Sequence, residues 1–106
     1  MEIQITIGGR KTVDPNDVIS LKGDINYTTV VFQNGRRKET VATTLKKIQS
    51  QLEPFPNFYR ITKSTIINLD CISKVSNNQI SLINGEVIVP SRRRGKFFFK
   101  SIWKDN

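Results

Sequence analysis

The hydrophobic residues of this sequence recur mainly at every second position, in short runs that are separated by turn residues. Residues 3–7 alternate apolar and polar, Gly8-Gly9 follows as a two-residue hairpin signal, and residues 11–13 are predicted to return. Residues 27–33 are nearly all β-branched or aromatic, which favours a strand. Because successive side chains of a strand point to opposite faces, this pattern restricts the chain to a mainly β fold.

Two more strands are expected in the first half of the chain. Residues 18–22 are predicted to be extended, with Ile19 and Leu21 on one face, and residues 23–26 are expected to end this strand. Residues 36–41 are polar and basic, which is typical of an exposed or edge strand, because charge there discourages pairing between sheets.

One segment in the middle of the chain changes to a helical period. Leu45, Ile48 and Leu52 are spaced at i, i+3 and i+7, with lysine and glutamine residues on the other side. Thr43 or Thr44 is a suitable N-cap. We therefore predict one amphipathic helix of about ten residues, which two following prolines end.

The second half returns to strand patterns and ends in a basic helix. Residues 58–61 and 66–69 are apolar and extended, and a three-stranded meander is predicted over residues 71–76, 79–83 and 86–89. Residues 92–104 are predicted to be helical. Strands and helices do not alternate as in a parallel sheet. We therefore expect one domain over residues 1–106, mostly antiparallel, with two small helices.

Histidine is absent from the chain, and Cys71 is its single cysteine. A Ser-His-Asp triad, a Cys-His dyad, a Cys/His zinc site and an intramolecular disulfide are therefore all excluded within it. The nine carboxylates fall mostly in predicted turns or exposed strands, and the sequence has no phosphate-binding glycine-rich loop. We expect the protein not to be an enzyme and to use no metal, cofactor or small-molecule substrate.

The N-terminal residues lack the apolar core of a secretory signal. The longest apolar runs are far shorter than the roughly 20 residues of a membrane-spanning helix. The sequence therefore predicts a cytoplasmic protein that does not contact a membrane.

Positive charge is concentrated in the second half of the chain. The formal net charge is +8; residues 1–53 carry 8 basic and 6 acidic side chains, whereas residues 54–106 carry 9 basic and 3 acidic. A small domain with one strongly basic half is typical of proteins that bind polyanions, although a basic surface also serves solubility.

Three segments carry the residues that we expect to bind a polyanion. The densest is residues 92–94 with Lys96, because arginine forks match phosphate oxygens and the guanine edge. The second is the polar loop 62–65 between two apolar runs, and the third is residues 23–28. Each loop is also typical of an ordinary turn, and the aromatic residues 97–99 are typical of a core.

Two stretches of the sequence resemble motifs of LytTR-type DNA-binding domains. Residues 58–72 are similar to the family pattern aromatic-x-Arg-Ile-His-Arg/Lys-Ser, followed by an apolar triplet, Asn-Leu and Ile. Residues 89–93, Val-Pro-Ser-Arg-Arg, resemble the Pro-Val-Ser-Arg-Arg stretch that opens the last helix of the family. Thr62 stands where the family commonly has His. The order and spacing of these pieces, over about residues 18–102, carry the resemblance.

The resemblance implies sequence-specific binding of double-stranded DNA by a transcription regulator, with loops in successive major grooves. It places base contacts at Lys63, at Arg93 with Arg92, and in residues 26–28. The residues expected at the DNA are Asn26, Tyr27, Thr28, Arg60, Thr62, Lys63, Ser64, Ser91, Arg92, Arg93, Arg94 and Lys96.

The resemblance also implies how such a domain is used. Members of the family bind direct-repeat sites, so a homodimer on DNA is expected. The chain is expected to be a stand-alone regulator or part of a response regulator of a two-component system, with no receiver domain within residues 1–106.

Two other functions stay open from the residues themselves. An RNA-binding β domain would stack bases on exposed aromatic residues, although Tyr59 and Phe32 form no obvious pair for this. A protein-interaction or membrane-surface module would use the apolar side of the terminal helix, which consists of Phe98, Phe99, Ile102 and Trp103.

Overall fold

The computed structural model describes residues 4–33 and 37–103, and short strands make up most of its regular structure. The first half contains the strands β1 (Ile5–Gly8), β2 (Lys11–Val13), β3 (Val18–Asp24), β4 (Tyr27–Phe32) and β5 (Lys38–Val41), followed by helix α1 (Leu45–Leu52). The second half contains β6 (Phe58–Thr62), β7 (Thr65–Asn68), β8 (Ile72–Ser76), β9 (Gln79–Leu82), β10 (Val87–Ile88) and helix α2 (Arg92–Phe97). Short helical turns are η1 (Pro15–Asp17), η2 (Leu69–Cys71) and the π-helical η3 (Phe98–Ile102).

The strands form three antiparallel units. The largest is a five-stranded sheet in the order β5-β4-β3-β7-β6, and β8, β9 and β10 form the predicted three-stranded meander. β1 and β2 form a separate hairpin. These pairings confirm the mainly β, antiparallel fold expected from the sequence, including the place of β5 at a sheet edge.

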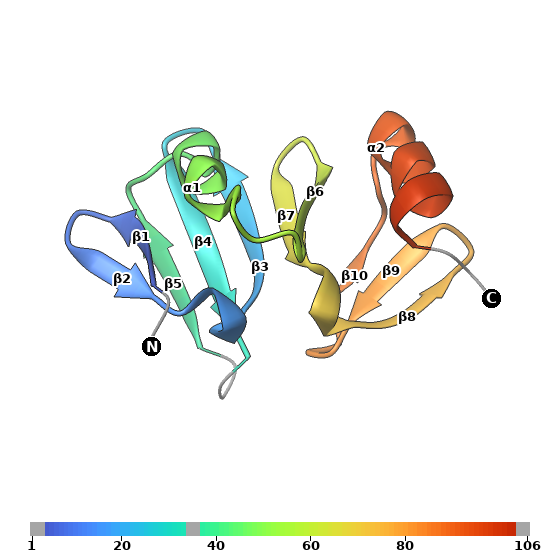
Figure 1. Ribbon diagram of the computed structural model, residues 1–106, viewed down its shortest axis with the longest axis horizontal. Helices are drawn as coiled ribbons and strands as arrows, with labels where there is room; N and C mark the ends of the chain where they lie inside the picture. Colours follow the sequence, from blue (N-terminus) through green and yellow to red (C-terminus); the bar gives the residue numbers. More distant parts are fainter. Residues whose placement is uncertain (1–3, 34–36, 104–106) are drawn as a thin grey trace.

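Two hydrophobic cores lie on opposite faces of the five-stranded sheet. Val30 and Ile66 belong to the first core, whereas their neighbours Val31 and Ile67 belong to the second. Helix α1 and the β1–β2 hairpin cover the first core, and the three-stranded sheet with the terminal helix covers the second (Figure 1). The central strands are therefore buried on both faces, which explains why they are apolar along much of their length.

The prediction that Ile19 and Leu21 share a face of β3 is wrong. Ile19 packs in the second core and Leu21 in the first. The pairing of β3 with β4 shifts register between Val18 and Ser20, so β3 carries one extra residue there. This bulge reverses the alternation, so Ile19 and Leu21 face different cores.

The β3–β4 hairpin is longer than the sequence predicts. β3 continues through Asp24, and Gly23, which was expected to end the strand, pairs with Thr28. A Cβ atom at Gly23 would lie 2.8 Å from the Cβ atom of Leu45, so this glycine serves the close approach of α1 to the sheet. The chain reverses only at residues 25–26.

Helix α1 confirms the predicted amphipathic segment. Its apolar residues Leu45, Ile48 and Leu52 are buried in the first core. The Thr44 hydroxyl accepts a hydrogen bond from the backbone N–H of Lys47, at 3.3 Å, so Thr44 is the N-cap.

The terminal helix differs from the prediction in length and form. α2 ends at Phe97 and continues as the π-helical η3, and Lys104 lies outside the described residues. Phe98 is completely buried in the second core, and Ile102 and Trp103 pack against it. This packing confirms the expected buried side. Phe98 is therefore not available to a membrane surface.

Candidate nucleic-acid interface

Three segments that are far apart in the sequence lie along one edge of the molecule. They are the β3–β4 turn (residues 24–27), the β6–β7 turn (residues 62–65) and the start of α2 (residues 91–96), which we call the loop edge (Figure 1). The structure thus brings together the three segments that the sequence singles out.

The β6–β7 turn is held between the other two segments by backbone hydrogen bonds. On one side, the N–H of Gly23 donates to the carbonyl of Ser64, at 2.8 Å. On the other side, the N–H of Ser91 donates to the carbonyl of Ile61, at 3.2 Å. These bonds fix the positions of the three segments relative to one another.

The guanidinium group of Arg60 holds the β6–β7 turn by hydrogen bonds. Its Nε donates to the carbonyl of Lys63 at 3.0 Å, its Nη2 donates to the same carbonyl, and its Nη1 donates to Oε1 of Gln49 in α1, at 2.8 Å. Burial, and to a lesser extent the positive charge of Arg94, lowers the pKa of Arg60. With its donors engaged inside the protein, Arg60 positions the turn.

An Arg60→Lys variant tests this positioning role, because it keeps the charge and loses the fork. We expect the melting temperature to fall by a few degrees, which corresponds to about 1 kcal/mol in a domain of this size. Duplex affinity should fall as well, since Lys63 is no longer fixed. Calorimetry and fluorescence anisotropy measure the two effects. Wild-type values for both would contradict the assigned role.

Two of the predicted contact residues serve the fold of the turns. Thr28 is completely buried, and its hydroxyl donates to the carbonyl of Thr43 at 2.6 Å, so its side chain is not available to DNA. The Thr62 hydroxyl accepts from the N–H of Ser64 at 3.2 Å, which shapes the β6–β7 turn. Lys63 and Ser64, at the tip of the turn, are exposed.

The start of α2 presents most of its cations outward. Arg92, Arg93 and Lys96 are exposed, whereas Arg94 is half-buried and its carbonyl accepts a hydrogen bond from the Tyr59 hydroxyl, at 3.0 Å. Burial raises the pKa of Tyr59 further above its ordinary range, which favours the protonated phenol that donates this hydrogen bond.

Ser91 occupies the N-cap position of α2, as predicted, but does not use its side chain to cap the helix. Its hydroxyl lies 3.5 Å from the carbonyl of Ile61 in β6. The residue therefore ties the helix to the sheet. Gly95 allows the close approach of α2 to the preceding Pro90, because a Cβ atom there would lie 2.9 Å from the Cβ atom of Pro90.

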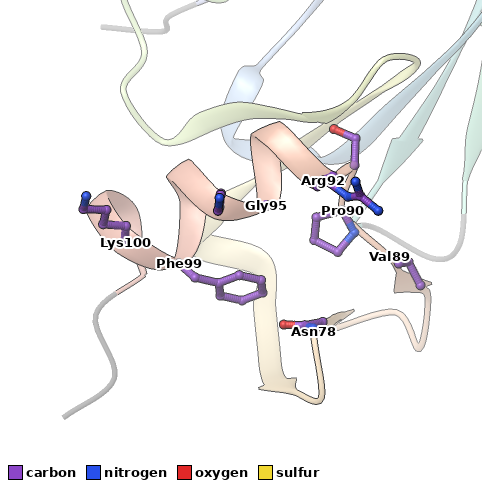
Figure 2. A pocket seen from close by; sticks show the side chains of 9 residues that line it. Asn78, Val89, Pro90, Arg92, Gly95, Phe99 and Lys100 are labelled. Carbon is purple, nitrogen blue, oxygen red and sulfur yellow. The ribbon is translucent and has the colours of Figure 1, made fainter.

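An apolar cleft of about 650 Å³ adjoins the basic side of α2. Phe99 points across it toward Asn78, and Val89 and Pro90 line its other end (Figure 2). Arg92, Lys96 and Lys100, spaced at i, i+4 and i+8, also line it. The positive surface of α2 therefore continues away from the loop edge.

A smaller cleft of about 290 Å³ separates the β3–β4 turn from the β6–β7 turn. Ile25 and Lys63 line it together with the first residues of α1, and Asp24 supplies the one carboxylate in the lining. Among the described residues, the other acidic side chains lie elsewhere. Asp17 and Asp70 are in η1 and η2 at the opposite edge, and Glu39 and Glu86 pair with lysines.

The sequence did not single out Ile25 as a functional residue. The structure places its side chain at the tip of the β3–β4 turn with 89% of its surface exposed. Asn26 and Tyr27 beside it are also exposed, as predicted for contact residues. An aliphatic residue between Asp24 and Asn26, where a turn favours small or polar residues, was the available signal.

Within residues 4–33 and 37–103, the side chains form no group of three or more potential metal ligands. The helices of the same segments are also too short and too polar to cross a membrane.

Two comparisons with known proteins give matches over most of this chain. The family model described as the LytTr DNA-binding domain matches residues 8–103. Among solved structures, the LytTr DNA-binding domain of a protein described as a methyl-accepting/DNA response regulator from Bacillus cereus superposes with a TM-score of 0.70. The two chains are 23% identical, and the match covers 92% of this chain and 93% of the other. A search of the curated proteins found no match.

Proposed function

Because the chain belongs to the LytTR family of DNA-binding domains, we propose that it binds double-stranded DNA sequence-specifically as part of a transcription regulator. One observation carries the finer part of this proposal: three segments with exposed polar and basic side chains share one rigid edge. On this edge, Lys63, Arg92 and Arg93 can contact a single duplex together.

The residues divide into three roles in this proposal. Lys63 and Arg93 read base edges in the major groove, where arginine and lysine bind the O6 and N7 atoms of guanine. Asn26 offers an amide for a third contact. Arg92, Lys96, Ser64 and Tyr27 contact the phosphate backbone, and the positive charges of Arg92 and Lys96 release counterions. Arg60, Thr62, Ser91 and Arg94 position the contacting groups.

The dimensions of the molecule support contacts in successive grooves. The loop edge runs along the longest axis, which measures 41 Å, and one turn of B-DNA measures about 34 Å. One copy therefore covers about one helical turn. We propose that two copies bind direct repeats with the half-sites about two turns apart, because copies 41 Å long would overlap at a spacing of one turn.

Selection of bound duplexes from a random pool tests the proposal. We expect enrichment of a short motif that occurs twice in the same orientation, about 21 base pairs apart from centre to centre. The selected duplex should bind more tightly than a random one in competition, and single-stranded RNA should compete poorly. A pool that stays random after selection would contradict sequence-specific binding.

Salt dependence is the control for the backbone contacts. With two to four phosphate contacts per copy, the slope of log affinity against log salt concentration should be about −2 to −4 on any duplex. A flat slope with intact binding would show that phosphates contribute little.

A further inference from the structure

Ile25 combines full exposure with an unfavourable backbone conformation. Its φ is +43°, a conformation that a β-branched residue rarely adopts. The other non-glycine residues with positive φ in the described segments are Asn77 and Asn78, a residue type that accepts it. The sequence therefore keeps an isoleucine where glycine or asparagine would be easier to accommodate, and strain of this kind is frequent at functional sites.

Packing within the protein does not explain Ile25. Its side chain is 89% exposed and belongs to neither hydrophobic core, whereas the next most exposed large apolar residue, Val89, is 62% exposed. A single exposed apolar residue is common at a protein surface. Ile25 is also strained and lies at the edge that is proposed to contact DNA. This combination suggests that its side chain contacts a partner outside the protein.

The surroundings of Ile25 place it beside a proposed base-reading residue. Ile25 and Lys63 line the same cleft of about 290 Å³. The hydrogen bond from Gly23 to Ser64 ties the two turns together, so the separation of Ile25 from Lys63 is fixed. A duplex that meets Lys63 in its major groove therefore also meets Ile25.

The chemistry of the major groove leaves one apolar partner. Base edges there present hydrogen-bond donors and acceptors, and among unmodified bases only thymine adds an apolar group, its C5 methyl. We propose that Ile25 is a specificity-determining residue that contacts the C5 methyl group of a thymine close to the base pair read by Lys63. This inference rests on the proposed function and names one feature of the target sequence.

Removal of single methyl groups from the DNA tests the inference. In the selected duplex, each thymine is replaced in turn by deoxyuridine, and affinity is measured by fluorescence anisotropy. We expect one position at which the replacement weakens wild-type binding about three- to fivefold, the factor for one buried methyl group. Ile25→Gly should bind the two duplexes equally, and Ile25→Val should keep most of the difference.

Two controls separate contact from folding. Ile83 is a half-exposed isoleucine that follows β9 and does not belong to the loop edge. The Ile83→Ala variant should therefore leave the thymine preference unchanged. Ile25→Gly should melt at or above the wild-type temperature, because glycine accepts the positive φ. Loss of discrimination by this variant then reflects the missing side chain.

The outcomes distinguish this inference from the function on which it rests. If the wild type selects a motif but tolerates deoxyuridine at every thymine, Ile25 does not read a methyl group and the inference fails alone. The inference also fails alone if the Ile25→Gly variant prefers thymine over deoxyuridine as strongly as the wild type does. If no motif is selected, the proposed function fails, and the inference fails with it.

Discussion

A Phe98→Ala variant is expected to lose about 3–5 kcal/mol of folding free energy, a large part of the stability of a small domain. Phe98 is fully buried in the second core. Its ring packs edge-to-face against Phe99, with centroids 5.1 Å apart, and lies 6.2 Å from the Trp103 ring and 6.0 Å from the Tyr59 ring. Truncation would leave a cavity among these rings, because the surrounding strands cannot close around alanine.

Denaturant unfolding followed by circular dichroism measures this loss. Phe97→Ala is the matched control, because Phe97 is the neighbouring residue and is 55% exposed, with one stacking contact to Tyr59. We expect the control to lose about 1 kcal/mol or less. Equal losses for the two variants would show that the second core does not depend on Phe98.

The second large effect concerns Arg93. Arg93→Ala should lose about 1–3 kcal/mol of binding free energy on the selected duplex, which is a factor of roughly 5 to 150. The loss on random DNA should be smaller, because a base contact is absent there. Because Arg93 is exposed, the melting temperature of the Arg93→Ala variant should stay close to that of the wild type.

Arg10→Ala is the matched control for Arg93. It removes the same charge from the exposed turn between β1 and β2, away from the loop edge. Gel shifts on selected and random duplexes measure both variants. If Arg93→Ala weakens the two duplexes equally, Arg93 contacts only the phosphate backbone.

Local patterns in the sequence were sufficient to predict most elements of the fold. The helical spacing of Leu45, Ile48 and Leu52 identified α1, and Thr44 identified its start. The meander from β8 to β10 followed from alternation and turn residues. These features depend on neighbours in the chain, and periodicity reports such neighbours well.

Features that depend on distant residues could not be read from the sequence. The bulge at Ile19 shows only in the pairing of β3 with β4, which no local pattern reports. The same holds for Thr28, which the resemblance placed at the DNA but whose hydroxyl is buried against the carbonyl of Thr43. Glycine is unfavourable inside a helix by intrinsic propensity, and the close approach of Pro90 explains why Gly95 stands in α2. The contact residues themselves stay predictions.

The β6–β7 turn is fixed on both sides by main-chain hydrogen bonds, from the N–H of Gly23 to the carbonyl of Ser64 and from the N–H of Ser91 to the carbonyl of Ile61. The side chains at the tip of the turn take no part in these two bonds. Every amino acid offers the same backbone carbonyl, so positions 63 and 64 can change identity while the frame stays in place. New target preferences can therefore arise by exchange of a few surface residues, at little cost in folding. In this domain, evolution of recognition and maintenance of the fold are largely separate tasks.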